Sequence, residues 1–158
     1  MDISDEEVIQ LWKAFHKHKL RYIMVGGFAT NLHGFNRITD DLDIWIQDSI
    51  ENRKILQKAL QEIGIENTES FLTTQFIPGW TGIILPSGFS LDIMTFLKGF
   101  EQSRFEECFE LASTATIYEI PVKFLHLNHL IESKKATDRP KDKIDLDELE
   151  KIRKTSSE

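Results

Sequence analysis

Residues 25–46 read VGGFATNLHGFNRITDDLDIWI, and this stretch decides which fold we expect the chain to adopt. The apolar run at its start predicts the end of a buried strand, and the pair Gly26-Gly27 predicts a sharp turn. Near its end, polar and apolar residues alternate, which predicts a second strand with Asp41 and Asp43 on one face. The stretch therefore combines a strand, a glycine turn and a second strand that presents two carboxylates.

Further elements are expected on both sides of this stretch. Apolar residues at helical spacing predict helices at about 4–19, 28–33, 49–63, 100–111, 128–136 and 143–154. Extended patterns predict strands at about 21–25, 41–46, 90–97 and 116–125, with a hairpin or two edge strands within 71–85. We take Pro121 as the mark of an edge strand, because proline cannot donate to a sheet ladder. This order predicts an α/β (α+β) fold, with a mixed β-sheet and flanking helices.

Length and composition fit one domain that spans 1–158, with a core at about 20–125 and C-terminal helices at about 126–154. The chain has 158 residues, of which 41% are hydrophobic and 28% charged, so disorder and fibrous classes are excluded. A net charge of −7 argues against generic binding of DNA, RNA or anionic lipid, because neutralising phosphates needs a cationic surplus.

Several sequence features bear on location and on metal binding. The first residues show no signal-peptide pattern and no apolar run approaches a membrane span, so we expect a cytoplasmic protein without a membrane partner. The single cysteine, Cys108, excludes an internal disulfide and is expected to be a buried thiol on a helix. His126 and His129 have a spacing that zinc can use, but the sequence shows no third ligand nearby, which favours capping or surface roles.

The aspartates point to metal-dependent phosphate chemistry. Asp41 and Asp43 lie two apart in a strand, so their Cα atoms are about 6.5–7 Å apart on one face and their charges repel. A divalent cation, Mg²⁺ or Mn²⁺, accounts for such a pair because it prefers hard oxygen ligands. Asp92 also lies between apolar residues in an alternating strand. If the two strands are neighbours, three carboxylates can hold two metals that clamp a phosphoryl displacement.

Three further residues or motifs near the aspartates admit functional interpretations. The turn Gly26-Gly27 lets a phosphate approach backbone amides, although such a pair alone is typical of an ordinary turn. Arg37 either contacts a phosphate or forms an ion pair with a neighbouring aspartate. Trp45 shares the face of Asp43 and is either a core residue or a stacking platform for a base.

With these motifs in this order, the sequence resembles the nucleotidyltransferase superfamily of the DNA polymerase β type. It is similar in particular to small prokaryotic members associated with toxin–antitoxin loci. The shared pattern falls on Val25-Gly26-Gly27, on Asp41-Leu42-Asp43 and on Leu91-Asp92-Ile93. The resemblance implies that the two glycines hold nucleotide phosphates and that Asp41 and Asp43 coordinate the metals. It makes Asp92 a third ligand or a base.

The resemblance extends to about residues 20–150 and includes a C-terminal segment. There it implies that Lys134 contacts the triphosphate and that Arg139 with Asp142 positions the last helices. The residues alone also allow Lys134 to be a solvated charge on a helix surface.

Two functions follow as hypotheses. The first is a metal-dependent enzyme that moves a nucleoside monophosphate from an NTP such as ATP to a hydroxyl, with a protein or an RNA as candidate acceptor. The alternative is a catalytically weak or inactive binding module that acts as an antitoxin-like partner, which the acidic charge and small size favour. No Walker loop, hydrolase elbow or Rossmann glycine motif occurs in the sequence.

Overall fold

A computed structural model of the chain describes residues 6–35, 39, 41–66, 68–69, 80–137 and 139–156. Its helices are α1 (Glu6–Lys17), α2 (Gly26–Leu32), α3 (Ile50–Glu62), the short 3₁₀ helix η1 (Gln102–Arg104), α5 (Phe105–Leu111), α6 (Leu127–Lys135) and α7 (Pro140–Ser156). Its strands are β1 (Tyr22–Val25), β2 (Asp41–Ile46), β3 (Trp80–Ile84), β4 (Ser90–Met94), β5 (Ser113–Ile117) and β6 (Ile120–Phe124).

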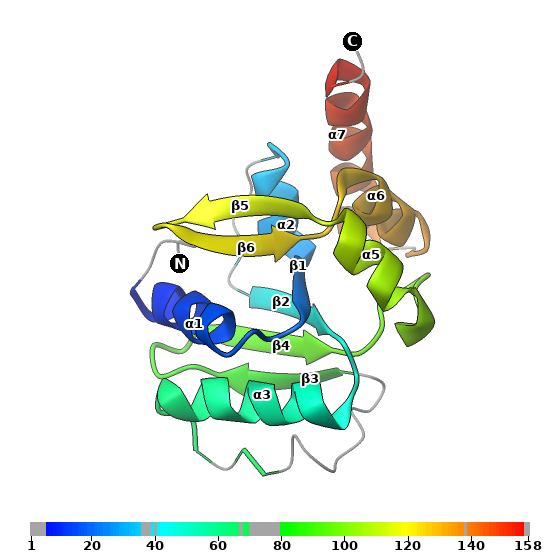
Figure 1. Cartoon of the computed structure of the whole chain (residues 1–158). Helices are drawn as coiled ribbons and strands as arrows, with labels where there is room; N and C mark the ends of the chain where they lie inside the picture. Colours follow the sequence, from blue (N-terminus) through cyan, green and yellow to red (C-terminus); the bar gives the residue numbers. More distant parts are fainter. Residues whose placement is uncertain are drawn as a thin grey trace.

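The strands form one six-stranded mixed sheet in the order β3-β4-β2-β1-β6-β5 (Figure 1). β2 runs parallel to β4, and β1 runs parallel to β6. The pairs β1–β2, β3–β4 and β5–β6 are antiparallel. The predicted fold class, a mixed sheet with flanking helices, is therefore confirmed.

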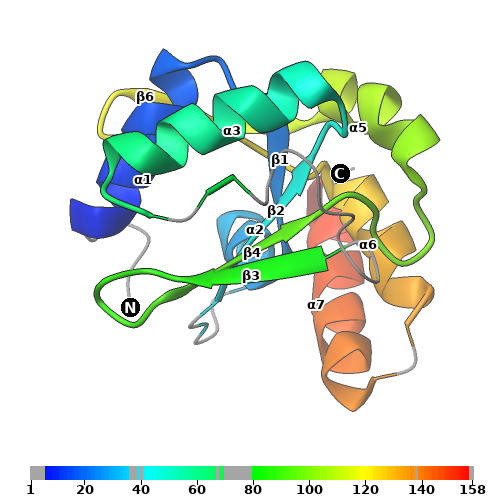
Figure 2. The ribbon, with the colours of Figure 1, turned by 90° about the horizontal axis from the view of Figure 1, so that it is seen from below.

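Helices cover both faces of the sheet. Figure 2 shows α1 and α3 on one side of the strands and α2 and α7 on the other. The helix α1 buries its apolar face through Trp12 and Phe15, whose rings pack against Tyr22 of β1. On α3, the Ser49 side chain accepts a hydrogen bond from the Asn52 amide and so caps the helix at its start. Within the described residues, no helix combines the length and apolar character that crossing a membrane requires.

The antiparallel pairing of β1 and β2 positions the glycine turn. Val25, the last residue of β1, lies opposite Asp43 of β2. The chain then enters α2 at Gly26, two residues before the predicted helix start, so the turn and the helix begin together. The end of β1 and the first half of β2 therefore meet at one edge of the sheet.

One predicted strand is in fact a hairpin. The segment expected to be a single strand at 116–125 holds the end of β5 and all of β6, which are joined at Tyr118 and Glu119. Both turn residues have positive φ, 47° and 69°, without the Asn or Gly that usually signals such a turn. The interpretation of Pro121 as an edge mark is wrong, because β6 lies between β1 and β5. Proline is accommodated because β6 pairs with β1 at Phe124 and not at Pro121.

Candidate active site

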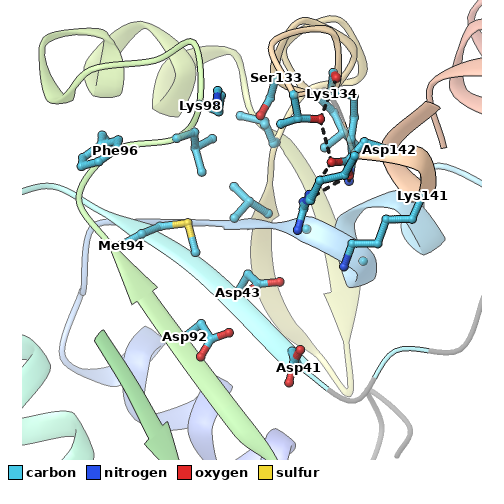
Figure 3. Close-up of a pocket in the computed structure, with 18 residues that line it drawn as sticks. Asp41, Asp43, Asp92, Met94, Phe96, Lys98, Ser133, Lys134, Lys141 and Asp142 are labelled. Atoms are coloured by element: carbon cyan, nitrogen blue, oxygen red, sulfur yellow. Dashed lines mark hydrogen bonds and ion pairs between the residues drawn. The ribbon is translucent and has the colours of Figure 1, made fainter. Parts of the chain in front are cut away.

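A pocket of about 350 Å³ opens where β1, β2 and β4 meet α6 and α7 (Figure 3). Aspartates lie on one side, apolar side chains form a wall, and cationic side chains approach from the C-terminal helices. The residues that line it are Val25, Gly26, Gly27, Asp41, Asp43, Asp92, Met94, Phe96, Leu97, Lys98, Leu125, Leu130, Ser133, Lys134, Thr137, Arg139, Lys141 and Asp142.

Sheet register brings the three aspartates together. Asp43 of β2 and Asp92 of β4 are direct partners in a parallel strand pair. Asp41 lies two residues before Asp43 on the same face and is exposed, whereas the other two are half-buried. The expected adjacency of these two strands is confirmed, and all three aspartates line the pocket, as Figure 3 shows.

The carboxylates destabilise one another as charged groups. Burial, together with the nearby charges of Asp92 and Asp41, raises the pKa of Asp43 to about 7, and Lys134 opposes this only in part. A group of hard oxygen donors that repel one another in a half-buried pocket is relieved when a divalent cation binds. The chemistry of these oxygen donors therefore suits magnesium or manganese, and Asp41, Asp43 and Asp92 are the residues that would hold the ion.

Gly26 is required by the position of Asp43. A Cβ atom at residue 26 would overlap the Oδ2 atom of Asp43 and lie 2.9 Å from its Cγ atom. The backbone φ of Gly26 is +71°, which also favours glycine. The missing side chain thus lets the carboxylate lie directly against the turn, and leaves the turn backbone bordering the pocket.

Lys134 lines the pocket but is held by carboxylates. Its side chain is 9% exposed, and its Nζ atom lies 3.1 Å from an oxygen of Asp142 and 3.1 Å from an oxygen of Asp145. In this structure its charge is therefore balanced within the protein. A role for Lys134 as a contact to triphosphate stays a prediction.

Asp142 is the centre of a hydrogen-bond network between α6 and α7. Its oxygens accept hydrogen bonds from Thr137 at 2.6 Å and from Arg139 at 2.6 Å, in addition to the bond from Lys134. Although burial alone raises the pKa of this carboxyl, these hydrogen bonds lower it to about 2. The network orients the start of α7 beside the pocket.

Two lysines in the pocket had no assigned role from the sequence. Lys98 and Lys141 are exposed, line the pocket, and form no ion pair with any residue that the structure describes. Figure 3 shows the side chain of Lys141 extended toward the aspartates. In the sequence, only their positions near candidate residues could have indicated a role in the site. Lys98 follows the strand of Asp92, and Lys141 directly precedes Asp142.

Two candidates from the sequence remain, Trp45 and Arg37. Trp45 is fully buried, its Nε1 atom donates to the Thr95 carbonyl, and it packs against Phe100 and Phe105, so its stacking role is excluded. Arg37 lies outside the described residues, so its predicted phosphate contact stays a prediction.

Comparisons with known proteins support the fold. No family model matches the sequence, and no curated protein matches it. Among solved structures, the chain is similar to the lincosamide antibiotic adenylyltransferase LnuA in its lincomycin-bound form, with 18% identity and a TM-score of 0.62. That match covers 96% of this chain and 99% of LnuA.

A second solved structure is an antigenic nucleotidyltransferase-like protein from Paracoccidioides brasiliensis. It has 15% identity and a TM-score of 0.52, and the match covers 92% of this chain and 74% of that protein. The two likenesses show that this chain has the fold of these nucleotidyltransferase structures.

Proposed function

We propose that this protein is a metal-dependent nucleotidyltransferase that moves a nucleoside monophosphate from an NTP to a hydroxyl group. The observation that carries the proposal is the register pairing of Asp43 with Asp92, beside Asp41 and the glycine turn, in one pocket of a nucleotidyltransferase fold. A strand pair with like charges directly opposite one another is unfavourable unless the site binds a cation.

The three aspartates would hold Mg²⁺ or Mn²⁺. When bound, the divalent cation supplies polarisation of the acceptor hydroxyl and charge neutralisation on the leaving pyrophosphate. The chain's own part is to fix the three carboxylates on two adjacent strands, so that little reorganisation is needed when substrates arrive. Asp92 then acts as the third ligand or as the base that takes the proton of the acceptor hydroxyl.

Phosphate binding would use the turn and the lysines. The backbone at Gly26-Gly27 borders the pocket without side chains, so phosphate oxygens can approach its amides. Lys98 and Lys141 bring positive charge to the same pocket, where it would balance a polyphosphate. Phe96 and Met94 offer an apolar surface beside the aspartates for a base or for the acceptor.

The comparison with LnuA bears on the choice between enzyme and binding module. The small size of this chain favoured a module without transferase activity, yet an adenylyltransferase is matched over 99% of its own length. A chain of this size therefore has room for an acceptor. Because LnuA was solved with lincomycin, a small hydroxyl-bearing molecule joins protein and RNA as an acceptor class to test.

Isothermal titration tests the nucleotide site. The wild-type chain is titrated with ATP in excess Mg²⁺, alongside Asp43→Asn and a control, Asp147→Asn, whose side chain is exposed on α7 outside the pocket. We expect Asp43→Asn to weaken binding by about tenfold or more, since it removes a metal ligand, and Asp147→Asn to bind as wild type does. Equal binding by all three proteins would refute the proposed site.

A transfer assay separates enzyme from module. An NTP radiolabelled in its α-phosphate is incubated with the chain, Mg²⁺ and separate pools of small hydroxyl compounds, RNA and protein. The proposal expects label in one pool together with released pyrophosphate, and none with Asp43→Asn. Nucleotide binding without transfer to any pool, even with co-purified partners present, favours the module.

A further inference from the structure

A second group of metal-ligating side chains lies outside the pocket, between α5 and α6. Glu107 and Cys108 come from α5, and His129 comes from α6. One potential ligand atom from each lies within 4.8 Å of the other two. The two helices are neighbours in both views of the fold (Figures 1 and 2).

The spacing within this cluster approaches that of a metal site. The Nε2 atom of His129 lies 3.4 Å from Oε2 of Glu107, which is long for a hydrogen bond. Two ligands that bind zinc tetrahedrally through nitrogen and oxygen lie about 3.3–3.5 Å from one another. The two side chains form an ion pair at a separation that also suits two ligands of one ion. The Glu107 side chain is half exposed, so a small movement would bring its carboxylate into position as a ligand.

Two atoms of these side chains are buried without partners. The thiol of Cys108 is fully buried and makes no hydrogen bond to a described residue. The Nδ1 atom of His129 is also buried and has no hydrogen-bond partner among the described residues, in a side chain that is 12% exposed. The thiol is therefore the unused ligand of the cluster, whereas Nδ1 is not part of it, because Nε2 is the ring nitrogen that lies near Glu107.

We propose that Glu107, Cys108 and His129 form a binding site for a borderline or soft divalent cation, of which Zn²⁺ is the type. A thiolate and an imidazole select zinc over magnesium, which keeps this site chemically separate from the three aspartates. With one carboxylate, the ligand set leaves a fourth position for water. His126 is not part of the set: its Nδ1 atom accepts from the Asn128 amide and caps α6, which confirms the capping role expected from the sequence.

The position of the site suggests its role. α6 carries Ser133 and Lys134 to the pocket, and His129 lies one turn before them on the same helix. Arg104 already links the two helices through Glu107 and Glu132. A cation bound to α5 and α6 together adds a constraint on α6, and so holds the cationic side of the pocket in place.

Cobalt spectroscopy tests the proposal. The folded, reduced chain is titrated with Co²⁺ in excess Mg²⁺, which occupies the aspartates. Because Cys108 is the only cysteine, a thiolate-to-cobalt charge-transfer band reports this site alone. We expect the band in wild type at one Co²⁺ per chain and its loss on addition of Zn²⁺. His129→Gln and Glu107→Gln should weaken Co²⁺ binding by about 10–100-fold, and the control Glu110→Gln, exposed on the same helix, should not.

Absorption at the zinc edge provides a test without a variant, in case a substitution prevents folding. Zinc-loaded wild type should show one sulfur ligand at about 2.3 Å and nitrogen or oxygen ligands at about 2.0–2.2 Å. Absence of the cobalt band, a band that His129→Gln leaves unchanged, or a zinc shell without sulfur would each overturn the proposal. None of these outcomes depends on nucleotide transfer.

Discussion

At the scale of single residues, Gly26 and Asp43 act as one unit. The carboxylate of Asp43 occupies the space that a side chain at residue 26 would need. Gly26→Ala therefore forces the carboxylate away from the pocket as well as placing alanine at positive φ. The glycine is demanded by a side chain from another strand, not only by its own turn.

We expect Gly26→Ala to lower the free energy of unfolding by about 3 kcal/mol or more and to abolish nucleotide binding. Gly88→Ala is the matched control, since Gly88 has φ +92° but no atom within 4 Å of the position that a Cβ would take. It should lose only the backbone contribution, about 1 kcal/mol. Urea unfolding of both variants measures the difference, and equal losses would show that the Asp43 contact is unimportant.

The raised pKa of Asp43 predicts a pH-dependent stability. Between the unfolded value of about 3.9 and the native value near 7, the native metal-free protein binds more protons than the unfolded chain, so its stability falls as pH rises. The Asp43→Asn variant does not show this fall in stability with rising pH. Its advantage over wild type should grow from about pH 5 to about pH 8 by roughly 2–3 kcal/mol, or about 4–12 °C in Tm.

Thermal unfolding in a chelating buffer measures that advantage. Groups common to both proteins cancel in the comparison, including His33, whose pKa burial lowers. Asp147→Asn should show no pH-dependent difference from wild type. If the advantage of Asp43→Asn were the same at both pH values, the aspartates would not be electrostatically coupled as described.

At the scale of elements, the contact between α6 and α7 depends on a buried ion pair. Lys134 contacts both Asp142 and Asp145, and Asp142 has no exposed surface. Removing one partner of a buried pair leaves charge without compensation, which costs more than losing a surface pair.

Asp142→Asn should therefore cost about 3 kcal/mol of stability. The exposed pair of Glu148 and Lys151 on α7 supplies the control, and Glu148→Gln should cost less than about 0.5 kcal/mol. Because the native pKa of Asp142 is lowered to about 2, its contribution is present above about pH 4 and is lost as pH falls toward 2. Equal stability of the two variants at neutral pH would contradict the buried-pair account.

The turn between β5 and β6 stores backbone strain. Tyr118 and Glu119 both adopt positive φ, and the Tyr118 side chain is exposed, so it contributes little packing. The double change Tyr118→Asn with Glu119→Gly matches the preferences of this turn. It should raise stability by about 0.5–1 kcal/mol, or about 1–4 °C in Tm.

The control for the turn variant is a glycine substitution at a residue whose φ is negative. Glu101→Gly, at φ −82°, should instead lower stability by up to about 1 kcal/mol, because it only adds freedom to the unfolded chain. A loss of stability in the turn variant, measured by calorimetry, would mean that the turn is not strained.

At the scale of the whole molecule, charge is distributed unevenly. The chain carries −7 overall, yet Lys98, Arg139 and Lys141 line the pocket that holds the three aspartates. The arrangement would suit the nucleotide of the proposed function together with its cation, because that ligand carries both signs of charge.

Ligand binding should therefore stabilise the whole molecule. At Mg²⁺-ATP concentrations about 100 times its Kd, the native state gains about 2.7 kcal/mol, which raises Tm by about 5–11 °C. ATP in chelator and Mg²⁺ alone should each produce a smaller shift in a fluorescence melting assay. An equal shift for wild type and Asp43→Asn would place the nucleotide outside the pocket.

Much of the site could be predicted because its signals are local. Alternation of polar and apolar residues around Asp41, Asp43 and Asp92 determined which strand faces carry carboxylates, since side chains in a strand alternate whatever the tertiary context. The glycine pair after an apolar run likewise predicted the turn. The predicted helix starts at 28 and 143 were less accurate. The helices begin at 26 and 140, because capping and packing decide where a helix begins.

Other features depend on contacts between distant segments. Only the packed structure shows that Asp43 lies opposite Asp92, that carboxylates of α7 neutralise Lys134, and that Cys108 meets His129. Parallel register and helix placement follow from how apolar faces pack together, which no short segment encodes. Local patterning specifies which chemical groups each strand and helix presents. Which of these groups meet depends on long-range packing, because packing brings separate segments to one place.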